Sequence, residues 1–84
     1  MRILIAEDDS ISRTTLQTVL SKKGFEVVET TDGVQAWEKL QESDPPRLLV
    51  LDIMMPGMDG LQLCRKIRSQ ETDDPAYIIM LTAK

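Results

Sequence analysis

The chain alternates short apolar runs with longer stretches whose apolar residues recur at helical spacing. The apolar runs are residues 3–6, 48–51 and 77–81, with a less apolar run at residues 25–29, and short runs between turn residues are typical of strands. Three stretches between them carry apolar residues on one predicted helical face: Ile11, Leu16, Val19 and Leu20; Val34, Ala36, Trp37 and Leu40; Leu61, Leu63, Cys64 and Ile67. The pattern predicts the element order βαβαβαβ.

Capping and turn residues indicate where these helices begin and end. Ser10 stands where the first helix should have its N-cap, and Asp32 and Asp59 can cap the second and third. Gly24, which follows two lysines, is typical of a helix C-terminus. Pro45 should end the second helix, because proline cannot continue one.

Alternating strands and helices with short connections predict an α/β fold with a doubly wound parallel sheet. Strands that are apolar on both faces need helices on both sides of the sheet. If the first strand is central, right-handed crossovers give the strand order 2-1-3-4, with the first helix on one face and the others opposite. The winding reverses between strands 1 and 3, and ligands bind beyond the carboxyl ends of strands at such a point. The acids of residues 7–9 and Asp52 should meet there.

Composition narrows the class of protein but not its activity. The 84 residues predict one small domain, residues 1–84, and the net charge of −4 argues against nucleic-acid binding by this segment. Cys64 is the only cysteine, so no disulfide can form within the chain, as suits a reducing compartment. The apolar run at the N-terminus is too short for a signal peptide or a membrane span. We therefore expect a cytoplasmic protein without a membrane partner.

The acids admit two interpretations on spacing alone. Asp52 is either a cap after its strand or a functional carboxylate, and Glu7 and Asp8 belong either to a solvated turn or to a metal site. Clustered carboxylates repel one another, so without a cation at least one tends to keep its proton. A bound cation would relieve that repulsion. Asp9 is expected to belong to the turn, and Asp59 to act as a cap.

Three motifs, ILIAEDD, LLVLDIMMPGMDG and IIMLTAK, lie at the ends of the first, third and fourth predicted strands and together resemble the receiver domain of bacterial two-component response regulators. The resemblance covers the whole chain and implies a flavodoxin-like fold with Mg²⁺ as cofactor. It further implies that a histidine kinase or phosphotransfer protein donates a phosphoryl group. On this resemblance Asp52 is the phosphoacceptor. Asp8 binds the metal directly, Glu7 acts through water, and Met54 offers its backbone carbonyl.

Two further residues take roles from the same resemblance. Thr82 resembles the hydroxyl residue that turns towards the phosphoryl group, and Ala83 the small residue that leaves room for it. A complete receiver continues through a last helix, strand and helix, whose lysine pairs with the phosphoryl oxygens. Lys84 does not match that lysine. We therefore expect this chain to bind the metal but to accept a phosphoryl group poorly. If the chain is part of a longer protein, we expect an output domain there.

Without a fifth strand, the fourth strand, residues 77–81, would lie at an edge of the sheet. Its sequence contains no charged residue and no proline. Such edges pair with other chains, so we expect self-association, segment exchange or membership of a longer protein. An association fragment without phosphotransfer is therefore the alternative function. An aspartyl phosphatase is disfavoured, because Met54 stands where such enzymes place a second acid. The chain is not expected to be an enzyme.

Overall fold

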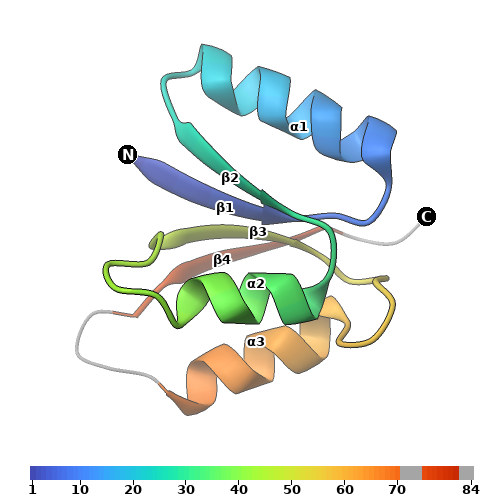
Figure 1. The fold of residues 1–84 in the computed structure, drawn as a ribbon, viewed down its shortest axis with the longest axis vertical. Coiled ribbons are helices and arrows are strands. Elements are labelled where there is room, and N and C mark those ends of the chain that lie inside the picture. Colours follow the sequence, from blue (N-terminus) through green and yellow to red (C-terminus); the bar gives the residue numbers. More distant parts are fainter. Residues whose placement is uncertain (71–74, 82–84) are drawn as a thin grey trace.

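A four-stranded parallel sheet, described here by a computed structural model of residues 1–70 and 75–81, lies between helices (Figure 1). The elements are β1 (Arg2–Ala6), α1 (Ser10–Lys22), β2 (Glu26–Thr30), α2 (Gly33–Leu40), β3 (Leu48–Asp52), α3 (Gly60–Ser69) and β4 (Tyr77–Leu81). The predicted element order is confirmed. None of these helices has the length and apolar content needed to cross a bilayer. Thr82, Ala83 and Lys84 lie outside the described residues.

The strands are hydrogen-bonded in the order β2-β1-β3-β4, and every neighbouring pair is parallel. The predicted order 2-1-3-4 is therefore confirmed. α1 covers one face of the sheet, whereas α2 and α3 lie side by side on the other (Figure 1). The winding reverses between the adjacent strands β1 and β3, which places a ligand-binding point beyond their carboxyl ends.

Two apolar clusters, one on each face of the sheet, form the core. Successive side chains of a strand point to opposite faces, so strands without polar alternation fill both clusters. Leu4 and Leu51 belong to the cluster under α2 and α3, where Leu63 of α3 is fully buried. Ile5 and Val50 belong to the other cluster. The partly buried residues packed against that second cluster include Leu16, Leu20 and Phe25.

Aspartates cap all three helices. Asp32 and Asp59 cap α2 and α3, as predicted. The prediction that Ser10 caps α1 is wrong by one residue, because the carboxylate of Asp9 accepts a hydrogen bond from the Ser12 N–H at 2.8 Å. A carboxylate both satisfies the unpaired amide and complements the positive end of the helix dipole.

The sequence overestimates how many apolar helix residues are buried. The predicted core positions that are instead exposed are Ile11, Val19, Val34 and Leu61. Val34 and Leu61 each lie two residues from a buried residue of the same helix, and that rotation of about 200° points them away from the sheet. The second strand also starts one residue later than predicted, at Glu26.

Candidate functional site

The register of β1 and β3 brings three acids together. Ala6 pairs with Leu51 at the end of the β1–β3 ladder, so Glu7 and Asp8, which follow β1, lie beside Asp52, the last residue of β3. One carboxylate oxygen from each acid lies within 4.8 Å of the others. The expectation that acids from the first and third strands meet is confirmed.

Glu7 is the most buried acid of the three, with 7% of its surface exposed. Burial raises its pKa to about 7, and the neighbouring carboxyl groups of Asp52 and Asp8 act in the same direction. A hydrogen bond from the Asp9 N–H to Glu7 Oε2, at 3.1 Å, opposes that rise. Burial first, and the neighbouring carboxyl groups second, therefore raise the pKa of Glu7 so that the metal-free cluster favours a proton close to neutral pH.

Asp52 is half-buried at the last position of β3. The Met54 N–H donates a hydrogen bond to Asp52 Oδ1 at 3.3 Å, which orients the carboxylate. Met54 itself is 63% exposed and lines the same open depression as the three acids. The Ile53 N–H donates to the Leu81 carbonyl at 3.3 Å, so the chain beyond Asp52 is tied to β4.

The donor set fits a hard divalent cation. Three carboxylates converge, and no lysine or arginine among residues 1–70 and 75–81 forms an ion pair with Glu7, Asp8 or Asp52. Mg²⁺ takes oxygen ligands at about 2.0–2.1 Å and usually keeps several waters, so a few carboxylates suffice. The Asp9 side chain accepts the capping hydrogen bond of α1, in line with the expectation that Asp9 belongs to the turn.

Comparison with known families agrees with this geometry. The family model of the response regulator receiver domain matches residues 3–84. The chain belongs to this family. Among solved structures, the response regulator TrrA from Thermotoga maritima, in complex with Mg(2+)-BeF, superposes with a TM-score of 0.88 at 36% identity. That similarity covers 99% of this chain and 70% of the TrrA chain.

Curated relatives are response regulators too. The receiver is 46% identical over 84 residues to the response regulator MprA of Mycobacterium avium, covering 100% of this chain and 36% of MprA. It is 40% identical over 83 residues to the transcriptional regulatory protein PhoP of Bacillus subtilis, covering 99% of this chain and 33% of PhoP. The receiver thus spans about a third of the length of these relatives.

Two glycines, Gly33 and Gly60, let helix N-termini approach the loop after Asp52. A Cβ atom on Gly60 would collide with the Asp52 carbonyl oxygen and touch the Met80 side chain. A Cβ atom on Gly33 would collide with the carbonyl oxygen of Met58. Both glycines directly follow a capping aspartate. This repeated Asp-Gly pair is the sequence signal from which the close approach could have been predicted.

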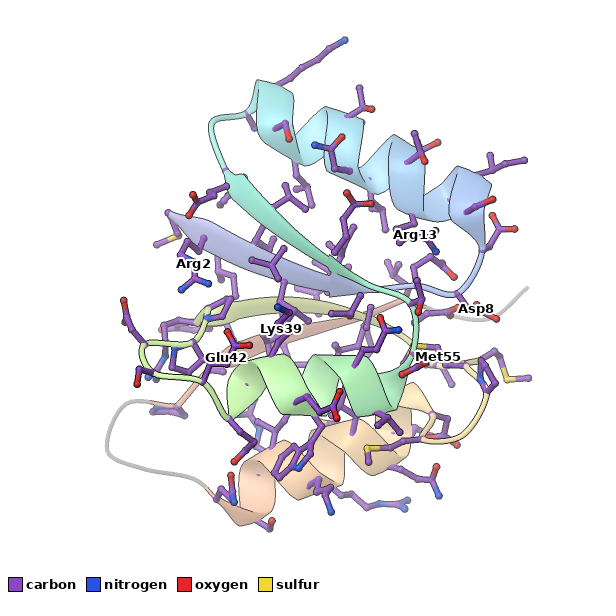
Figure 2. All side chains as sticks on the ribbon, in the orientation of Figure 1. Arg2, Asp8, Arg13, Lys39, Glu42 and Met55 are labelled. Carbon is purple, nitrogen blue, oxygen red and sulfur yellow. The ribbon has the colours of Figure 1, made fainter. Side chains whose placement is uncertain are left out.

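Arg13 is a second feature of the receiver that sequence reasoning missed. Its side chain extends from α1 towards the end of β1, where Asp8 follows (Figure 2). Arg13 Nη1 donates to the main-chain carbonyls of Glu7, at 2.9 Å, and Asp8, at 3.3 Å. Arg13 Nε also lies 3.8 Å from Glu29 Oε1 on β2. Only its position four residues after an acidic turn could have suggested this contact.

Proposed function

We propose that this receiver accepts a phosphoryl group on Asp52 from a histidine kinase or phosphotransfer protein, with Mg²⁺ as cofactor. The observation that carries the proposal is the convergence of Glu7, Asp8 and Asp52 at the point where the winding reverses. These acids and the Met54 carbonyl would hold the ion. The complex of TrrA with Mg(2+)-BeF supports the choice of metal.

The residues of the site can perform a simple displacement. A carboxylate oxygen of Asp52 attacks the phosphorus, the new P–O bond forms, and the bond from phosphorus to the donor's histidine nitrogen breaks. The electron pair of that bond leaves with the imidazole. Bound Mg²⁺ would supply positive charge for the phosphoryl oxygens, which is the main requirement of phosphoryl transfer. The Met54 N–H keeps one Asp52 oxygen in place during the attack.

Asp52→Asn should abolish labelling by acetyl phosphate and Mg²⁺, because the amide is no nucleophile. Intact-mass spectrometry should show one acid-stable, base-labile phosphoryl group on the wild-type chain and none on the variant. The matched control is Asp44→Asn, since Asp44 lies in an exposed turn at φ 54°, a conformation that asparagine accepts. Equal labelling of Asp52→Asn and wild type would refute the proposed acceptor.

We further propose that the site accepts phosphate stoichiometrically and is not an enzyme. Met54 has a thioether at the position where aspartyl phosphatases carry an acid, so it cannot protonate a leaving group. The response regulator relatives, which are about three times as long, support an output domain as a further partner. Membership of the receiver family supports a cytoplasmic location. The net charge of −4 supports the view that the receiver itself does not bind nucleic acid.

The alternative function, self-association, has one observation in its favour. Among the described strands, β4 lies at the edge and pairs only with β3. Tyr77 and Ile79 of β4 are 74% and 56% exposed. An uncharged edge strand that exposes apolar side chains is a template for pairing with a second chain. We therefore propose that the 84-residue polypeptide also associates with itself through β4.

Ile79→Lys should shift the 84-residue polypeptide towards the monomer, because a lysine on an edge strand opposes pairing. Sedimentation velocity over a range of concentrations measures the shift. Val34→Lys places the same charge at an exposed position of α2 and should leave the association unchanged. A wild-type chain that stays monomeric at high concentration would contradict the proposed association.

A further inference from the structure

The turn between β1 and α1 carries two of the three site acids, and its main chain lies beyond the sheet ladder. β1 ends at Ala6, so the carbonyls of Glu7 and Asp8 have no strand partner. Glu7 is buried whereas Asp8 is exposed, so the Glu7 carbonyl in particular needs a donor from within the protein. Arg13 supplies it: its Nη1 donates to the Glu7 carbonyl at 2.9 Å and to the Asp8 carbonyl at 3.3 Å.

The same guanidinium is itself held in place. Arg13 Nε lies 3.8 Å from Glu29 Oε1, and the Arg13 side chain is only 20% exposed. The contacts therefore link α1, the turn after β1, and β2. A guanidinium suits this task because its donors form a rigid planar fork, whereas a lysine offers one compact charge on a flexible stem.

We propose that Arg13 is a positioning residue, which fixes the main chain of Glu7 and Asp8 so that their carboxylates converge with Asp52 on a divalent cation. It bonds carbonyl oxygens and leaves the carboxylate oxygens of these acids for the ion. The inference rests on the proposed function, because it presumes that Mg²⁺ binds at this site.

The direction in which cation affinity changes when Arg13 is replaced distinguishes a positioning role from a purely electrostatic one. Removing a positive charge beside an acidic site strengthens cation binding if the charge acts only through space. Removing a group that fixes the ligands weakens cation binding, although the site becomes more negative. A change at Arg13 therefore gives opposite results under the two interpretations.

Arg13→Ala should weaken Mg²⁺ binding about tenfold, the loss expected when an outer partner of metal ligands is removed. Arg13→Lys keeps the charge but cannot span both carbonyls and Glu29, so it should lose nearly as much. The matched control is Arg2→Ala, which removes the same charge and an ion pair with Glu26 at 3.5 Å, at the other end of the sheet. Its affinity, measured like the others by titration calorimetry, should stay at the wild-type value.

A second measurement needs no metal. In the metal-free chain, amide hydrogen exchange at Glu7 and Asp9, whose N–H groups bond to Thr30 O and Glu7 Oε2, should be faster in both Arg13 variants. Exchange in Arg2→Ala should match the wild type. Unchanged exchange in Arg13→Lys, or Mg²⁺ binding as tight as in wild type, would overturn the inference. A wild-type chain without Mg²⁺ affinity would instead refute the proposed function, while the exchange rates still decide the role of Arg13.

Discussion

Gly60→Ala should destabilise the receiver by about 2–3 kcal/mol and weaken Mg²⁺ binding, because the new methyl group has no room. The side chain of Met80 can move aside, but the Asp52 carbonyl belongs to the main chain that positions Asp52, the proposed phosphoacceptor. Relief of the collision must therefore shift either α3 or the end of β3. Urea unfolding would give the loss of stability, and calorimetry the loss of affinity.

Gly24→Ala provides the control for that experiment. Gly24 follows α1 at φ 95° with nothing within 4 Å of an added Cβ atom, so alanine there is strained but meets no neighbour. It should cost about 1–2 kcal/mol, the penalty for a left-handed backbone, and leave Mg²⁺ affinity unchanged. If Gly60→Ala also left the affinity unchanged, the close approach of α3 would not position the site.

The metal-free receiver should lose stability as the pH rises from about 5 to about 8, by up to about 3 kcal/mol. Burial raises the pKa of Glu7 from 4.5 to about 7 in the folded chain. The folded state therefore holds a proton that the unfolded state has already released, and ionisation favours unfolding. The contribution of this proton to stability is fully present below the unfolded pKa of 4.5 and is lost as the pH rises through the folded pKa of about 7. Saturating Mg²⁺ should offset the loss, because the ion binds the deprotonated carboxylates.

Glu7→Gln isolates this effect, because it keeps the shape of the side chain and removes the titration. Unfolding free energies of the metal-free variant should stay nearly constant between about pH 5 and about pH 8. Glu38→Gln, which removes the same charge from an exposed position on α2, should keep the wild-type slope. Wild-type stability that is constant or rising across this pH range would show that Glu7 is ionised in the fold.

The fold could be predicted from the sequence because the central strands have a recognisable pattern. Residues 3–6 and 48–51 are apolar without alternation, which is the pattern of a strand buried on both faces, and both proved to be central. The convergence of Glu7, Asp8 and Asp52 followed from topology alone, since parallel strands end at the same edge.

The details that shape the site could not be predicted, because they depend on distances between elements. Arg13 lies on a helix that the pattern defines only by its apolar face, so its bonds to the Glu7 and Asp8 carbonyls carry no periodic signal. The collision at Gly60 depends on the depth to which α3 packs. Ser10 and Asp9 are both good caps, and only the backbone geometry of Asp9, at φ −76° and ψ 122°, decides between them.

The pairing of β1 with β3 determines when the receiver can fold during its synthesis. These neighbours in the sheet are separated along the chain by α1, β2 and α2, so more than half the polypeptide lies between Asp8 and Asp52. A nascent chain on the ribosome cannot assemble the cation pocket until Asp52 has emerged and β3 has docked. On the proposed function, Mg²⁺ would bind only molecules whose central ladder is complete, and raising its concentration should draw the folding equilibrium towards them.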